Sequence, residues 1–347
     1  MTSLERAFPV PSDRTVLILG ATGGLGGAIA ERLAARGWSV AARVRDPARA
    51  AKSRPNAPWR WLVGDAMDAS DVMAAAAGAR WIVHAVNPPR YRNWRGQALP
   101  MLSNAVAAAE ASGARILFPG NDYNFGPDAG CLVDETAAQN PTTRKGRVRV
   151  EMEALLRAAA TRGVRSLVVR AGDFFGPGIA GSWFAGLVAK GIIAHNAGGA
   201  EPRSVSYPAG DPQAGHAWAY VPDLAETMVR VMEREEDLAP FEVFHFGGHW
   251  VEPGLAIATA AAVAAGRPDL PVKTMSWWPL ALLAPFDTFM REVLEMRYLW
   301  QRPLRLDNRK LVAFLGHEPH TPLGQAARAA IGRPRTSLAE AVRAAAL

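Results

Sequence analysis

Three glycines at three-residue spacing, Gly20, Gly23 and Gly26, stand between an apolar run and an alanine-rich stretch. Glycine lets a phosphate approach the backbone closely, and a helix that begins there points its backbone N–H groups at the phosphate oxygens. The pattern therefore predicts a site for a dinucleotide pyrophosphate. The residues expected to line this turn are Gly20, Thr22, Gly23, Gly24, Leu25 and Gly26.

The residues after the second apolar run bear on which dinucleotide is bound. The segment AARVRD places Arg43 and Arg45 before Asp46. An acidic residue at the end of this strand would accept the ribose 2′-hydroxyl of NAD, whereas arginine suits a 2′-phosphate. The arginines favour NADP over NAD. The alternative is that Asp46 turns toward the ribose and the arginines are solvated.

Short apolar runs alternate with helical stretches through the first two thirds of the chain. The predicted strands are residues 15–19, 38–43, 59–63, 81–86, 114–119, 164–170 and 241–248, and the predicted helices are 28–37, 70–77, 99–112, 147–161 and one that begins near Pro222. Strands that are apolar throughout are buried on both faces, which is typical of a parallel sheet covered by helices. We predict an α/β fold with a doubly wound parallel sheet, the Rossmann fold, and a smaller C-terminal substrate lobe.

The glycine turn resembles the TGxxGxxG fingerprint of the short-chain dehydrogenase/reductase superfamily. Four later segments resemble its extended branch, the NAD-dependent epimerase/dehydratase type: residues 64–65, 84–89, 173–178 and 219–226. The resemblance covers about residues 14 to 250. It implies that Asp65, with Ala66, contacts the adenine and that Ala85 and Val86 lie beside the nicotinamide ribose.

The catalytic pair of that superfamily is missing, which makes the chain atypical. A tyrosine four residues before a lysine supplies the proton there, and a serine or threonine orients the carbonyl. None of the five tyrosines is followed by lysine at that spacing. With Glu151 as the reference point, Thr143 takes the tyrosine position and Arg147 the lysine position, while Asn121 falls near the serine.

Two hypotheses explain this departure. In the first, the proton donor has moved; Tyr123 is then the best replacement and Lys145 a second one, although Lys145 would point differently on a helix. The protein would be an NADP-dependent oxidoreductase or epimerase-like enzyme acting on a small carbonyl, hydroxyl or nucleotide-sugar substrate. In the second, the protein binds NADP without catalysis, as a sensor or scaffold. We lean toward the enzyme.

Substrate contacts are expected where loops follow the strand ends. The segment NPPRYRNWR supplies Asn87, Tyr91, Trp94 and Arg95, which suit an anionic or sugar-like ligand, although a solvated basic loop would have the same composition. Asp173 and Phe174 should line the entrance to the second lobe.

Composition limits the remaining classes of function. The chain has 347 residues, a net charge of +7 and one cysteine, Cys131, which excludes a disulfide framework and indicates a cytoplasmic location. The histidine pairs 245/249 and 317/320 lack a third ligand nearby, so no metal is expected. The basic residues cluster near the predicted crevice, which favours a small, anionic substrate over nucleic acid.

The stretch from Trp277 to Met290 is broken by prolines, so we predict no membrane span but a buried or lid-like segment. A homodimer is left open. The expected domains are an N-terminal arm (1–13), a dinucleotide-binding core (14–175 and 212–247) and a substrate lobe (176–211 and 248–347).

Overall fold

The computed structural model describes residues 14–88, 93–179, 181–208 and 210–332. These residues form two compact units. The first comprises the described residues up to Gly120 together with Lys145–Arg170 and Ala225–Phe244. The second comprises Asn121–Arg144, Ala171–Leu224 and the described residues from His245 onward. Residues 121–144, which we expected in the core, thus belong to the second unit.

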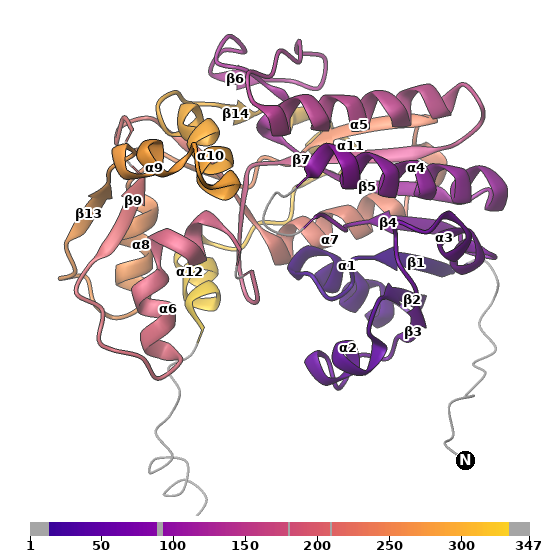
Figure 1. The fold of residues 1–347 in the computed structure, drawn as a ribbon, viewed down its shortest axis with the longest axis horizontal. Coiled ribbons are helices and arrows are strands. Elements are labelled where there is room, and N and C mark those ends of the chain that lie inside the picture. The colour runs from indigo at the N-terminus through magenta and orange to yellow at the C-terminus, as the bar shows by residue number, and fades with distance from the viewer. Residues whose placement is uncertain (1–13, 89–92, 180, 209, 333–347) are drawn as a thin grey trace, which may run out of the picture. The chain divides into compact units, whose positions relative to one another are not determined.

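A seven-stranded sheet with the order β11-β7-β5-β4-β1-β2-β3 organises the first unit (Figure 1). Its strands are β1 (Thr15–Leu19), β2 (Ser39–Val44), β3 (Arg60–Val63), β4 (Trp81–His84), β5 (Arg115–Asn121), β7 (Ser166–Ala171) and β11 (Phe241–His245). β1 pairs in parallel with β2 and β4. The strand order reverses between β1 and β4, which is where doubly wound sheets bind their ligands.

Helices cover both faces of this sheet, with α4 and α5 on one side and α1 and α7 on the other (Figure 1). The helices of this part are α1 (Gly24–Ala35), α2 (Pro47–Ser53), α3 (Ala69–Ala76), α4 (Trp94–Ser112), α5 (Arg144–Ala160), α7 (Val221–Met232) and the 3-10 turn η4 (Glu235–Asp237). Buried residues of α3, α4 and α5 share one apolar cluster with the strands. Glu226 on α7 binds Arg32 and Arg36 on α1. The predicted doubly wound fold is confirmed.

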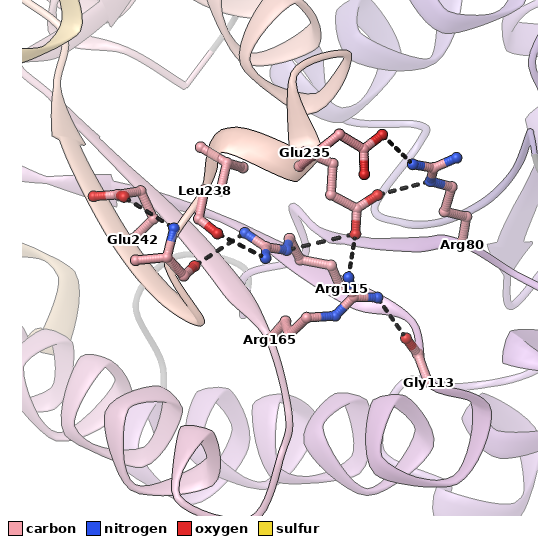
Figure 2. A network of polar contacts seen from close by, with 9 residues as sticks. Arg80, Gly113, Arg115, Arg165, Glu235, Leu238 and Glu242 are labelled. Atoms are coloured by element: carbon pink, nitrogen blue, oxygen red, sulfur yellow. Dashed lines mark hydrogen bonds and ion pairs between the residues drawn. The ribbon is translucent and has the colours of Figure 1, made fainter. Parts of the chain in front are cut away.

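A buried carboxylate ties the amino ends of three central strands together. Arg80, Arg115 and Arg165 stand at the starts of β4, β5 and β7 and converge on Glu235 (Figure 2). Arg115 also donates to the carbonyl oxygens of Leu238 and Ala239. Ligands bind at the opposite, carboxyl ends of such strands. The arginine cluster is therefore part of the scaffold.

The second unit is built from short elements around its own core. Its strands are β6 (Leu132–Val133), β8 (Asp173–Phe175), β9 (Val205–Pro208), β10 (His216–Tyr220), β12 (His249–Val251), β13 (Val272–Met275) and β14 (Arg305–Leu306). Its helices and turns are η2 (Asp122–Asn124), η3 (Phe184–Val188), α6 (Lys190–Asn196), α8 (Ala256–Ala264), α9 (Trp278–Leu283), α10 (Thr288–Leu294), η5 (Glu295–Trp300), α11 (Arg309–Leu315) and α12 (Leu323–Ile331). β10 lies between β8 and β12 in a three-stranded sheet. Aromatic residues fill the centre, with Trp218 and Trp300 fully buried.

For the stretch from Trp277 to Met290 we expected a buried or a lid-like segment, and the buried alternative is wrong for most of it. Trp277 is buried, but Trp278, Leu282 and Leu283 on α9 are exposed, and Phe286 is 90% exposed. α9 and α10 are short and separated by a proline-containing turn, so they bury little of their apolar surface. Within the described ranges, no helix is long and apolar enough to cross a membrane.

Candidate functional site

The glycine turn brings the ends of β1 and β4 and the start of α1 into close contact. Gly20 has φ +99°, and a Cβ there would lie 2.6 Å from the Ala85 carbonyl oxygen. A Cβ on Gly26 would overlap the Gly20 carbonyl. Gly20 and Gly26 are therefore required by packing, whereas Thr22 and Gly23 are exposed.

The start of α1 suits the binding of an anion. Gly23 caps the helix without a side-chain hydrogen bond, and the first turn contains no acidic residue. Leu25 is buried and anchors the turn, and Gly24 is half-buried at its surface. A dinucleotide pyrophosphate fits these residues, because the backbone is bare and the helix dipole favours an anion. Arg54, which sequence analysis missed, donates to the Gly23 carbonyl oxygen at 3.3 Å.

The two arginines at the end of β2 have different surroundings. Arg43 is largely buried and lies 2.6 Å from the Asp71 carboxylate, whose pKa the hydrogen bond from Arg43 lowers. Its guanidinium also fills the space beside Gly64. We therefore correct our prediction for Arg43: its positive charge is paired with the Asp71 carboxylate inside the first unit. Arg45 is exposed.

Asp46 has a structural task as well. Its carboxylate accepts a hydrogen bond of 2.9 Å from the Arg49 backbone N–H and so caps α2. An N-cap of this kind stabilises a helix by about 1 kcal/mol. Its engagement as a cap counts against the alternative in which Asp46 turns toward a ribose.

The loop after β3 is held by the same Asp71. Asp71 accepts a hydrogen bond from the Asp65 backbone N–H at 2.9 Å, while the Asp65 carboxylate accepts one from the Met67 N–H. Asn104 on α4 fixes the Ala66 carbonyl at 3.0 Å. The predicted adenine loop is thus ordered by the first unit alone.

Past the end of β4, a buried arginine holds the loop that carries Asn87. Arg149 on α5 donates to Asn87 Oδ1 at 3.3 Å and to the Pro119 carbonyl oxygen at 3.2 Å. Its guanidinium also lies over the Trp94 ring, 5.0 Å from the centroid. Burial, and secondarily the Arg149 charge, lower the pKa of His84 to about 3. His84 is therefore neutral and Arg149 supplies the local positive charge.

The inward face of α5 lies two residues later than the predicted alignment. Glu151, our reference point, is half-exposed and pairs with Arg95, and Arg147 is exposed. The charged residues that point inward are instead Lys145, Arg149 and Glu153, all buried. Glu153 forms a bidentate pair with Arg170 on β7, at 2.6 and 3.1 Å. Arg149 thus takes the inward position that our alignment had assigned to Arg147.

The second unit begins with the other predicted catalytic residues. Asn121 ends β5, and its side-chain oxygen accepts a hydrogen bond of 3.1 Å from the Tyr123 backbone N–H. The Tyr123 hydroxyl donates to Asp173 Oδ1 at 3.3 Å. Tyr123 is half-buried, whereas Thr143 is buried just before α5. The contact with Asp173 places the hydroxyl of Tyr123, a predicted proton donor, next to a titratable group.

Asp173 joins Tyr123 to a histidine that sequence analysis missed. Asp173 Oδ2 lies 2.8 Å from His216 Nε2, and both side chains are buried, at 7% and 4% exposed. Neighbouring Asp122 is buried too, and burial, reinforced by the Asp173 charge, raises its pKa well above the usual value. His216 opens the strand HAWAY, where a histidine gives no signal of its own in the sequence.

The remaining predicted residues are spread over varied surroundings. Trp94 is buried under Arg149 and supports the loop, and its role as a substrate contact stays a prediction. Arg95 is exposed, Val86 packs on the core, and Phe174 is half-buried beside Asp173. Tyr91 lies outside the described residues. Among the described residues, no group of three or more histidine, cysteine or acidic side chains could hold a metal ion.

Comparison with known proteins identifies the family. The model of the NAD dependent epimerase/dehydratase family matches residues 16–247, from β1 to the end of the sheet. The chain belongs to this family. The resemblance noted in the glycine turn and the later segments is thereby confirmed, and the family accounts for the dinucleotide-binding fold of the first unit.

Several solved structures share the fold. A UDP-glucose 4-epimerase from Thermotoga maritima aligns with a TM-score of 0.71 and 15% identity, covering 96% of this chain and 100% of its own. A UDP-glucose 4-epimerase from Brucella ovis, in complex with NAD, aligns at 0.71 and 17%, covering 92% and 97%. WbmH from Bordetella bronchiseptica, in complex with NAD+, aligns at 0.68 and 19%, covering 92% and 97%.

A curated relative is closer in sequence. The 3-diazoavenalumate denitrifying reductase of a Streptomyces species is 33% identical over 180 residues. The match covers 47% of this chain and 57% of the reductase, so the chain spans somewhat more than half of that relative's length.

Proposed function

We propose that this member of the epimerase/dehydratase family is an NADP-dependent reductase of a small carbonyl compound or a comparable electrophile. The hydrogen bond between the Tyr123 hydroxyl and Asp173 is the observation that carries this proposal. Without a Tyr-x-x-x-Lys pair, another group must supply the proton. Along the chain, Tyr123 follows β5 by two residues, and doubly wound folds hold their ligands beyond the carboxyl ends of such strands.

Arg45 supports NADP as the cofactor. It is exposed at the end of β2, while Arg43 is held by Asp71 and Asp46 caps α2. An exposed guanidinium at this position suits a 2′-phosphate, and no acidic side chain of the segment is left for a 2′-hydroxyl. The relatives in complex with NAD are the competing precedent.

In the proposed reaction, the glycine turn, Arg149 and Tyr123 have separate roles. The turn from Gly20 to Gly26 would hold the pyrophosphate, and Arg149 would fix the loop beside the nicotinamide ribose through Asn87. When bound, NADPH supplies a hydride. Tyr123 would give its hydroxyl proton to the atom of the substrate that becomes negatively charged, which completes the reduction.

The reductase name of the curated relative favours reduction over epimerisation. The test is oxidation of NADPH, followed at 340 nm, with two carbonyl probes: benzaldehyde and 4-carboxybenzaldehyde. We expect turnover of a carboxylated aromatic probe and a loss of about 100-fold or more in Tyr123→Phe, the range of general acid catalysis. Tyr207→Phe is the matched control, because Tyr207 is a buried core residue of the same unit.

Two results would overturn the proposal. The first is turnover that Tyr123→Phe leaves unchanged, because the proton would then come from elsewhere. The second is NADPH binding with no oxidation on any probe, which would instead support the non-catalytic dinucleotide sensor.

A further inference from the structure

Both ring nitrogens of His216 face oxygen atoms. Nδ1 lies 3.2 Å from the Leu299 carbonyl oxygen and Nε2 lies 2.8 Å from Asp173 Oδ2. The donor and acceptor roles of the two nitrogens depend on the tautomer. In the tautomer with a hydrogen on Nδ1, the Leu299 carbonyl accepts it, and a hydrogen bond between Nε2 and Oδ2 then requires one further proton, on the imidazole or on the carboxyl group.

The pair lies in an apolar part of the second unit. Asp173 and His216 are both buried, and His216 stacks on Trp300 with ring centroids 4.0 Å apart and planes 9° apart. A lone buried charge would be costly, whereas the paired charges offset each other. A proton shared by Asp173 and His216 would leave the pair without net charge.

Two other titratable groups of the second unit lie near Asp173. Burial, reinforced by the charge of Asp173, raises the pKa of Asp122 well above its usual value. Burial, together with the charges of Asp122 and Asp173, raises the pKa of Tyr298, whose hydroxyl donates to the Phe125 carbonyl at 2.9 Å. Asp122 and Tyr298 therefore hold their own protons more tightly than they would in water.

We propose that Asp173 and His216 store a proton and return it to Tyr123 after each catalytic cycle, an assignment that rests on the proposed reductase function. Tyr123 Oη already lies 3.3 Å from Asp173 Oδ1, so the three side chains form a continuous hydrogen-bonded chain. The role of Asp173 thereby changes from lining an entrance to relaying a proton.

The step balances in protons. The O–H bond of Tyr123 breaks as the proton bonds to the substrate, which leaves a tyrosinate. The carboxyl group of Asp173, rotating about its Cβ–Cγ bond, then transfers the stored proton to the tyrosinate oxygen. This leaves a neutral His216 and an ionised Asp173, and the pair takes a new proton from water. A carboxylate alone would oppose a tyrosinate by charge repulsion, and the imidazolium removes that repulsion.

The proton count can be measured without any substrate. In wild-type protein labelled with ¹⁵N-histidine and ¹³C-aspartate, NMR at pH 8 reports the protonation of His216 and of the Asp173 carboxyl group. We expect one of the two to be protonated, although a free histidine, with a pKa of about 6.5, is neutral at this pH. His216→Gln and Asp173→Asn assign the signals, and His249 is an internal control because burial lowers its pKa to about 4. A neutral His216 beside an ionised Asp173 would overturn the proposal.

The relay itself is tested by the pH dependence of NADPH oxidation. We expect His216→Gln to lower kcat by about 10-fold or more at pH 8, with little change in KM, and to recover at pH 6, where water supplies protons more readily. His249→Gln is the control. If Tyr123→Phe abolishes turnover but His216→Gln leaves the profile unchanged, the relay is wrong and the reductase stands. If no probe is turned over, the reductase fails, while the NMR result still decides the proton store.

Discussion

Glu235 offers a sharp test of how the sheet is stabilised. Its carboxylate is 3% exposed and lies 2.7 Å from Arg80 Nε, 2.9 Å from Arg165 Nη1 and 3.6 Å from Arg115 Nε. Glu235→Gln keeps the shape of the side chain and removes its charge. Arg115 would then be a buried cation without its compensating carboxylate, and burial already lowers its pKa.

The expected loss follows from this burial. Removing one partner of a buried ion pair costs about 3–5 kcal/mol, because the other charge stays desolvated. For a chain of this length the entropy of unfolding scales to a fall in Tm of about 4–7 °C. Native proteins have only about 5–15 kcal/mol of total stability, so a considerable part would be lost.

Urea unfolding followed by circular dichroism measures the effect, and Glu236→Gln provides the matched control. Glu236 is 83% exposed and contacts the same Arg80 at 3.3 Å, so its loss should cost less than about 1 kcal/mol. Equal, small effects of the two variants would refute the reasoning that burial makes Glu235 important.

Two further predictions concern the first unit. Gly20→Ala should weaken NADPH binding by about 10-fold or more, because the added Cβ would meet the Ala85 carbonyl. Gly37→Ala is the control: Gly37 has φ +79° but no atom within 4 Å of an added Cβ, so the substitution strains only the backbone and the variant should bind normally. Equal binding by the two variants, measured by calorimetry, would contradict the close packing of the turn. His84 is neutral when folded and takes up a proton when unfolded, so the unfolding free energy should fall from about pH 6.5 toward pH 3, by up to about 1.4 kcal/mol per pH unit. His84→Gln should flatten this slope in urea titrations at several pH values, and an unchanged slope would show that His84 is protonated in the fold.

The first unit could be predicted from the sequence because its signals are local. Continuous apolar runs such as 15–19 indicate buried strands, and the glycine spacing fixes the turn that follows. The boundaries shifted by a few residues; α4, for example, begins at Trp94 and continues through Pro100, although the sequence indicated a start near residue 99. The second unit gave no such pattern, because its strands are short and pair with partners far along the chain.

The candidate site was predictable only in part, since its key contacts join distant segments. Tyr123 was identified from its position after the fifth predicted strand, but its partners Asp173 and His216 are 50 and 93 positions away. The i, i+4 spacing of Lys145, Arg149 and Glu153 could have revealed the inward face of α5. Our alignment took Glu151 as its reference point and therefore assigned the inward position to Arg147.

Calorimetric titration of the wild-type protein with NADPH and with NADH tests the central claim most directly. We predict that NADPH binds about 10-fold more tightly or better, and that Arg45→Asp removes this preference while Arg60→Asp, an exposed substitution on β3, keeps it. Tighter binding of NADH, or no binding of either dinucleotide, would contradict the account.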